Sequence, residues 1–148
     1  MKKVFLFSAL LLFAAGSFAH APSPNVNEKV LKVFAETFTE AQNVNWTEME
    51  DIYMVRFTNQ GIRTTVKYDA DGNFVSSLRY YECDQLPVDI QCKLKKKYPT
   101  KKMFGVTEYV VGDDLNYYVK LEDDKTWTTV KIDNYRNMQV TESYKKAN

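Results

Sequence analysis

Apolar residues recur at helical spacing in two separate segments of the chain, and alternating apolar and polar residues follow each segment. The first segment predicts a helix that begins at a cap on Asn25 or Asn27 and ends near Thr39. Its apolar stripe consists of Val30, Leu31, Phe34 and Phe38. The second segment predicts a helix that begins at Leu86-Pro87 and is stopped by Pro99. Its stripe consists of Ile90, Leu94 and Tyr98.

The alternating stretches predict antiparallel strands joined by short turns. After the first helix, a connection containing Val44 and Trp46 leads to strands over residues 53–57, 62–68 and 74–81. The turns between these strands have the composition of tight hairpins: Asn59-Gln60-Gly61 and Asp71-Gly72-Asn73. After the second helix we expect strands over residues 104–111, 115–122, 126–132 and 137–144.

The two halves also resemble each other position by position. Tyr53, Val55, Phe57, Thr65, Val66, Lys67 and Asp69 correspond, 64 positions later, to Tyr117, Val119, Leu121, Thr129, Val130, Lys131 and Asp133. In the helices the offset is 60 positions. This predicts an α+β fold over residues 20–148, built of two tandem helix-plus-antiparallel-sheet repeats at about 26–82 and 86–146. Two arrangements are open: one continuous curved sheet with both helices on one face, or two separate sheets.

The first 19 residues have the pattern of an export signal. Lys2 and Lys3 precede an apolar run over residues 4–15, which is too short for a stable membrane anchor. Small residues in Ser17-Phe18-Ala19 predict cleavage after Ala19, and hence a periplasmic or secreted protein. The remaining chain has 18 basic and 19 acidic residues. This balance excludes a strongly basic protein that binds nucleic acid.

Two cysteines, Cys83 and Cys92, lie nine positions apart. In an oxidising compartment they are a candidate disulfide that would link the end of the first repeat to the second helix. The alternative is that both remain thiols, either because they are buried or because their Cα atoms are badly placed for a bond. Two thiols without a neighbouring histidine are too few ligands for a metal site.

No motif for catalysis or cofactor binding is present. His20, the only histidine, lies beside the predicted cleavage site, so no Ser-His or Cys-His pair can form inside the domain. The segment from Asp69 to Gly72 resembles the start of a calcium loop, but Tyr80 stands at the twelfth position, where a carboxylate is needed. A hairpin turn explains the segment better. We expect no enzyme activity, no cofactor and no metal.

Lysines are concentrated at the end of the second predicted helix, in Lys93, Lys95, Lys96, Lys97, Lys101 and Lys102. They could form a patch that faces an anionic surface. A solvated helix face, with cations favourably placed near the helix C-terminus, is the preferred interpretation at this stage.

Three short motifs stand out: Ala41-x-x-Val44-x-Trp46 after a helix, Tyr68-Asp69-x-Asp71-Gly72, and Leu86-Pro87. In these motifs the chain resembles the PepSY-like domains of exported bacterial proteins. The second half departs from this resemblance, with Val106 where the first half has Trp46 and Arg136 where it has Gly72. This family's fold is related to the β-lactamase inhibitor protein, itself a tandem repeat. The resemblance implies a periplasmic, non-catalytic protein, with inhibition of a protease or hydrolase proposed for relatives.

Strand alternation divides the predicted sheet into a helix-facing and an open face. The helix-facing set is Tyr53, Val55, Phe57, Val66 and Tyr68, with Tyr117, Val119, Leu121, Val130 and Ile132. The open set is Met54, Arg56, Arg63, Lys67, Arg79 and Tyr81, with Tyr118, Lys120, Trp127 and Lys131. Aromatic rings among cations are typical of protein interfaces. Ordinary cross-strand pairs, with the cations facing water, are the equally weighted alternative.

These observations support one main hypothesis and two others. The first is a binding module that holds an envelope protein or peptide on the open face and inhibits an envelope enzyme. Its predicted anchors are Tyr81, Tyr118 and Trp127, with Arg79, Lys67 and Lys131 supplying charge. The second is a small-ligand or envelope-stress protein with a pocket between helix and sheet near Trp46. The third is a purely structural accessory domain.

Overall fold

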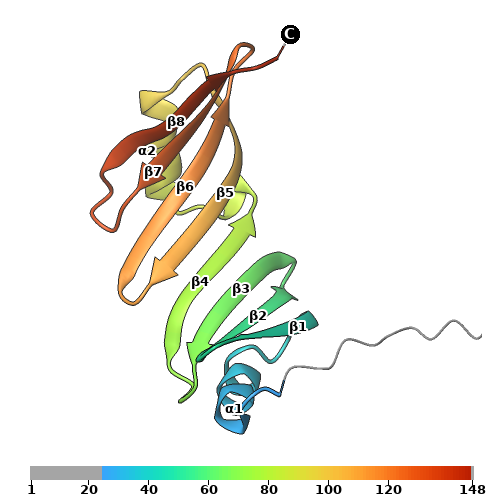
Figure 1. Ribbon diagram of the computed structural model, residues 1–148. Coiled ribbons are helices and arrows are strands. Elements are labelled where there is room, and N and C mark those ends of the chain that lie inside the picture. Colours follow the sequence, from blue (N-terminus) through green and yellow to red (C-terminus); the bar gives the residue numbers. More distant parts are fainter. Residues whose placement is uncertain (1–24, 148) are drawn as a thin grey trace, which may run out of the picture.

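The computed structural model describes residues 25–147, so the predicted export signal, its cleavage site and His20 lie outside the described residues. The element order is a helix followed by four strands, and then the same again (Figure 1). The first half contains α1 (Glu28–Thr37), β1 (Gln42–Met49), β2 (Ile52–Asn59), β3 (Ile62–Asp69) and β4 (Phe74–Tyr81). After a short 3-10 helix, η1 (Cys83–Gln85), the second half contains α2 (Val88–Lys97), β5 (Lys102–Val111), β6 (Asp114–Glu122), β7 (Thr126–Ile132) and β8 (Met138–Lys145). No helix in residues 25–147 has the length and apolar character needed to cross a membrane.

All eight strands form one antiparallel sheet in chain order, from β1 to β8. The halves are joined by β4 and β5, whose register runs from Ser76 opposite Val111 to Tyr81 opposite Val106. The sheet is therefore continuous. In Figure 1 it runs as one twisted ribbon of strands, with α1 at the β1–β3 end and α2 behind β6 and β7.

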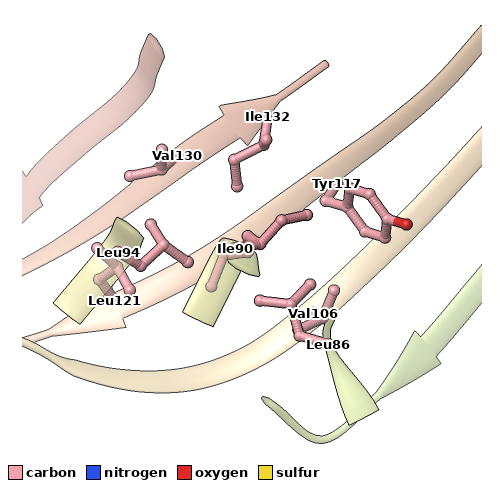
Figure 2. Close-up of a cluster of buried hydrophobic side chains, with 9 residues drawn as sticks. Leu86, Ile90, Leu94, Val106, Tyr117, Leu121, Val130 and Ile132 are labelled. Atoms are coloured by element: carbon pink, nitrogen blue, oxygen red, sulfur yellow. The ribbon is translucent and has the colours of Figure 1, made fainter. Parts of the chain in front are cut away.

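Each helix buries its apolar stripe against its own end of the sheet. Val30 and Phe34 of α1 pack against Val55, Phe57, Val66 and Tyr68. Ile90 and Leu94 of α2 join a second cluster with Leu86, Val106, Tyr117, Val119, Leu121, Val130 and Ile132 (Figure 2). The helix-facing residues predicted from strand alternation all lie in or against these two clusters. The predicted alternation of β2, β3, β6 and β7 is confirmed.

The helix ends follow from local hydrogen bonding. The Asn27 side chain accepts a hydrogen bond from the Lys29 backbone N–H at 2.9 Å, which makes Asn27 the N-cap of α1. At the other end Phe38 leaves helical geometry while its N–H still reaches the Phe34 carbonyl, so α1 ends at Thr37. α2 begins at Val88, and Pro87 is its N-cap residue rather than part of the first turn, close to the predicted start at Leu86-Pro87. The missing N–H of Pro87 has no helical partner to lose at this position.

One strand was missed by sequence reasoning. The segment with Val44 and Trp46, predicted as a connection, is β1. It is an edge strand that pairs with β2 alone, and its register shifts between Gln42 and Asn45. Because an edge strand buries little, most of its residues are polar and exposed, which weakens the alternation that would identify it.

The predicted disulfide is absent from the structure, in which Cys83 and Cys92 are both free thiols. Cys83 in η1 packs against the second core cluster, and burial raises the pKa of its thiol to about 11. Cys92 lies on α2 midway between the buried Ile90 and Leu94 in sequence, and it is exposed to solvent. A helical residue two positions from both buried neighbours points away from the core, which separates the two sulfur atoms.

The turns after β3 and β7 have the same hydrogen-bond pattern, 64 positions apart. Asp69 Oδ1 accepts from the N–H groups of Asp71 and Asn73, and Asn73 Nδ2 donates to Asp69 Oδ2, each at 2.9 Å. Asp133 Oδ1 accepts in the same way from the N–H groups of Tyr135 and Asn137, and Asn137 Nδ2 donates to Asp133 Oδ2, again at 2.9 Å. The calcium-loop alternative is unnecessary, because backbone donors already occupy the carboxylate.

These turns also connect each hairpin to the start of its helix. Lys29 of α1 forms an ion pair with Asp71 at 3.0 Å, whereas Asp89 of α2 forms one with Arg136 at 2.9 Å. Gly72 and Arg136 occupy equivalent positions with φ of +86° and +65°. In the second half Arg136 therefore adopts the left-handed backbone conformation that Gly72 adopts in the first half. The Arg136 side chain, which glycine lacks, forms the ion pair with Asp89.

Hydrogen bonds in these turns should make stability depend on pH. The Asn137 side chain first, and backbone N–H donors after it, hold the pKa of Asp133 below its ordinary value. Because the folded pKa is lowered, this carboxylate stabilises the fold above its unfolded pKa and loses that effect as pH falls through the folded pKa. We expect Asn137→Ala to raise the pKa of Asp133 toward its ordinary value in an NMR titration. Asn73→Ala is the control, and it should move Asp69 only; a shift at both aspartates would contradict the turn assignment.

Core packing gives a second prediction. Leu94 is 1% exposed and sits within the second cluster, while Val88 on the same helix is 73% exposed. Leu94→Ala should lower the free energy of unfolding by about 2–5 kcal/mol, because it removes buried methyl groups and leaves a cavity. Val88→Ala should change it by less than about 0.5 kcal/mol. Urea denaturation measures both, and similar losses would show that α2 is not docked through Leu94.

Candidate functional site

Cross-strand register assigns each strand residue to one of two faces. One row runs across the helix-bearing face through Phe57, Thr64, Arg79, Glu108, Tyr117 and Ile132. A neighbouring row runs across the open face through Thr58, Arg63, Tyr80, Thr107, Tyr118 and Lys131. Both helices lie on the first face, because α1 and α2 pack against residues of that face at either end. No helix of residues 25–147 covers the second face, and this face is the candidate site.

Aromatic side chains gather on the second half of this open face. Trp127 stands beside Phe104, with ring centroids 4.9 Å apart in an edge-to-face arrangement. Lys120 Nζ lies 5.0 Å from the centre of the Trp127 ring and 5.5 Å from that of Tyr144, the cross-strand partner of Trp127. The rings are held by one another and by cations, which leaves a fixed and partly exposed aromatic surface.

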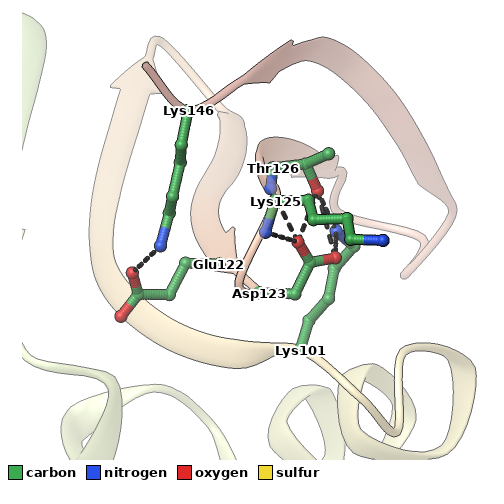
Figure 3. A network of polar contacts seen from close by, with 6 residues as sticks. All are labelled: Lys101, Glu122, Asp123, Lys125, Thr126 and Lys146. Carbon is green, nitrogen blue, oxygen red and sulfur yellow. Dashed lines mark hydrogen bonds and ion pairs between the residues drawn. The ribbon is translucent and has the colours of Figure 1, made fainter. Parts of the chain in front are cut away.

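A network of polar contacts holds the loop between β6 and β7, which directly precedes Trp127 in the chain (Figure 3). Asp123 accepts hydrogen bonds from the N–H groups of Lys125 and Thr126, and Lys101 Nζ donates to its Oδ2 at 2.6 Å. The Lys101 ammonium first, and the backbone donors after it, hold the pKa of Asp123 well below its ordinary value. Next to this loop, Lys146 Nζ pairs with Glu122 at 2.8 Å and lies 4.6 Å from the Trp127 ring centre.

Cations on the open face are largely without carboxylate partners. Five of them lie outside the ion pairs found in residues 25–147: Arg56, Arg63, Lys67, Lys120 and Lys131. Arg63 instead lies over the Tyr80 ring at 5.7 Å, much as Lys120 lies over Trp127. The face also carries Glu122 and Glu142, which lie opposite Trp127 and Thr129. The five cations outside ion pairs outnumber these two carboxylates, so an acidic partner would complement the face.

Two hollows of about 580 and 550 Å³ lie side by side on this face. Arg63 and Tyr80 line both of them. The first is bounded further by Phe104, Tyr118, Lys120, Glu82 and Glu142, and the second by Met54, Arg56, Lys67 and Tyr109. Hollows lined by aromatic rings and charged groups can receive protruding side chains of a partner.

Four of the six predicted binding residues lie on the open face. Tyr118 and Lys131 are cross-strand partners, and Trp127 lies on the same face of β7, four residues before Lys131. Lys67 lies at the other end of the face, opposite Met54 and Ser76. The structure thus places Tyr118 directly beside Lys131, with Trp127 further along the same face of β7, and leaves Lys67 apart.

Arg79 and Tyr81 were assigned to the wrong face. Arg79 pairs across the strands with Thr64 and Glu108, and Tyr81 pairs with Val106 and packs against the second core cluster. The cause is a register shift between Lys67 and Tyr68, which places one extra residue in β4. Because side chains alternate, one inserted residue moves every later side chain of the strand to the opposite face.

On the helix-bearing face these two residues form a cluster with Glu108. Arg79 donates to Glu108 Oε1 at 3.0 Å, and the Tyr81 hydroxyl donates to Glu108 Oε2 at 2.7 Å. Burial first, and then the bond to Glu108, raise the pKa of Tyr81 far above its ordinary value. The cluster links β4 to β5 where the halves meet, so Arg79 and Tyr81 have a structural role in that joint.

Sequence reasoning also missed aromatic members of the open face, namely Tyr80, Phe104, Tyr109 and Tyr144. Tyr80 was hidden by the same register shift that displaced Tyr81. Phe104 lies at a second shift, between Met103 and Gly105, and is 57% exposed. The alternation of side chains along their strands could have identified Tyr109 and Tyr144. Each lies opposite a residue of the open face, Leu78 and Trp127 respectively.

The predicted ligand pocket near Trp46 is filled by aromatic side chains. The ring centroid of Phe34 lies 5.2 Å from that of Trp46 and 5.1 Å from that of Phe57, and Phe38 packs on Phe57 at 4.7 Å. These rings are part of the first core cluster. Nor do residues 25–147 bring together three or more histidine, cysteine or acidic side chains in a group that could hold a metal ion.

Several solved structures with this fold come from Bacteroides species. A BLIP-like protein of Bacteroides fragilis superposes with a TM-score of 0.60 at 13% identity, covering 88% of this chain and 91% of that one. A DUF2874 family protein of Bacteroides uniformis gives 0.58 at 16% identity, with 80% and 88% covered. A Bacteroides eggerthii protein provisionally described as periplasmic gives 0.59 at 12% identity, with 82% and 90% covered. No known family profile and no curated protein sequence matches the chain.

At these identities the likeness shows the fold alone: an α+β protein of the BLIP-like type, with an open eight-stranded antiparallel sheet and two helices. The inhibitor-like part of the predicted resemblance is supported at the level of fold. The PepSY-like part is not shown by these neighbours and stays a prediction.

Proposed function

We propose that this protein is an exported, non-enzymatic binding module whose open sheet face holds a protein or peptide partner. The observation that carries the proposal is the ring pair of Trp127 and Phe104, with Tyr118 on the same face, which no helix of residues 25–147 covers. Large rigid rings bury much area at little entropic cost when a partner docks. Its location in the periplasm is supported by the N-terminal signal pattern and by a neighbour provisionally described as periplasmic.

The charge on this face indicates the chemistry of the partner. Arg63, Lys120 and Lys131 flank the aromatic group without carboxylate partners among residues 25–147. An acidic segment of a partner would supply those carboxylates, and the rings would receive its apolar side chains. One protein of this fold is named for its likeness to an inhibitor, so inhibition of an envelope enzyme is the form of binding that we favour.

We also infer that the molecule consists of two tandem copies of one unit. The offsets of 64 and 60 positions support this, as do the matching turns at Asp69 and Asp133. The two copies differ most on the open face. In the second copy Phe104 and Trp127 occupy the positions of Val44 and Arg63 in the first, at the offsets of 60 and 64 respectively. The proposed site therefore belongs chiefly to the second copy.

Affinity capture from an envelope extract tests the proposed function. Mature residues 20–148 should retain a specific protein, and a Trp127→Ala, Tyr118→Ala double variant should lose it, with at least a tenfold fall in affinity for removal of two anchors. Thermal unfolding should confirm that the double variant remains folded, because both side chains lie on the open face.

Tyr135→Ala is the matched control, since Tyr135 is 87% exposed but lies in the turn after β7 rather than on the open face. Its capture should equal that of the parent protein. Equal retention by parent and double variant, or no retained protein at all, would leave the open face as ordinary surface and contradict the proposal.

A further inference from the structure

Both helices pack an apolar stripe against the sheet, but the charges on their exposed sides differ strongly. Ile90 and Leu94 of α2 are buried as Val30 and Phe34 of α1 are, 60 positions apart. Around that stripe α2 exposes Lys93, Lys95, Lys96 and Lys97, which we call the lysine face. The equivalent residues of α1 are Val33, Ala35, Glu36 and Thr37. The last turn of α1 contains no basic residue, and α1 forms nonetheless.

Helix stability alone does not account for four lysines here. A cation in the last turn interacts favourably with the helix dipole, but Lys93 lies three and four residues before Lys96 and Lys97, at spacings where like charges repel. None of the four takes part in an ion pair within residues 25–147. Asp89, the one acidic residue of α2, is already paired with Arg136 at the opposite end of the helix. The charge is therefore uncompensated.

We propose that the lysine face docks on the anionic phospholipid surface of a membrane. The four cations are all lysines, and each lysine ammonium acts as a hydrated point charge. Such charges suit the diffuse negative field of many lipid phosphates, whereas a site that binds one carboxylate or phosphate through two parallel hydrogen bonds favours arginine. The patch also lacks an exposed aromatic ring for stacking on nucleic-acid bases, since Tyr98 is half-buried and packs against the core. This inference goes beyond the proposed partner site and is independent of it.

The fold places the two surfaces back to back. The lysines project from the sides of α2 that are not packed on the sheet, and α2 lies behind β6 and β7 in Figure 1. Tyr118 and Trp127 are on the opposite side of the same strands. A bilayer held against α2 would thus leave the open face directed away from the membrane and accessible to a partner.

Sedimentation with lipid vesicles tests the inference. Mature protein should bind vesicles of phosphatidylcholine containing about one third phosphatidylglycerol, and not vesicles of phosphatidylcholine alone. Binding should disappear at about 1 M salt, where screening acts over roughly 3 Å. Replacing the lysine face by glutamine (K93Q, K95Q, K96Q, K97Q) should weaken binding at least tenfold, because each lysine near an anionic surface contributes roughly fivefold.

A second quadruple variant with the same net charge is the control: K29Q, K32Q, K125Q and K145Q remove lysines of α1, of the β6–β7 loop and of β8, outside both proposed sites. It should bind within about twofold of the parent, if position rather than net charge decides. Equal losses in the two variants, binding to neutral vesicles, or no binding by the parent at low salt would each overturn the inference.

Cys92 offers a readout that does not depend on a multiple variant. It is exposed on α2, whereas Cys83 is half-buried with its pKa raised to about 11, so an environment-sensitive dye should react at Cys92 near neutral pH. Its emission should shift with phosphatidylglycerol vesicles and stay constant with phosphatidylcholine. An unchanged emission with both would place α2 away from the bilayer and contradict the proposal.

Discussion

The continuous antiparallel register of the sheet is the constraint on which the rest of the structure depends. Because side chains alternate along every strand, the pairing of β4 with β5 aligns the faces of the two halves. Both helices then fall on one side, and the other side stays free over all eight strands. Arg79, Tyr81 and Glu108 secure this joint with two hydrogen bonds to one carboxylate. The position of the open face follows from that joint.

Similar frameworks in the two halves carry different surfaces. The helix C-caps, the core clusters and the Asp69 and Asp133 turns keep the same pattern, although the N-caps differ and the ion pair between turn and helix reverses its charges. Outside this framework the halves diverge: the second half has Trp127 and Phe104 on the open face and four lysines on its helix. The first half has the same framework without these residues, and this difference is why we propose binding roles for them.

Much of the fold could be predicted from the sequence because two periodicities were strong. The stripes around Val30 and Ile90 gave both helices, and the alternation in β2, β3, β6 and β7 gave the correct buried face. β1 was missed because it is a polar edge strand. Arg79 and Tyr81 were misplaced because the extra residue in β4 has no local signature in the sequence, and only its pairing with β3 and β5 reveals it. The core of the candidate site, Tyr118 with Trp127, was predictable because the alternation before it is unbroken.

Site-specific photo-crosslinking would test most directly whether the open face is the binding surface. A photoreactive phenylalanine analogue would replace Tyr118 on that face in one variant and Tyr135 in the exposed turn after β7 in another. Both sites already hold an aromatic ring, so the fold should accept the change. The account predicts a crosslinked envelope protein from position 118 and none from position 135. Crosslinks from position 135 alone, or equally from both, would contradict it.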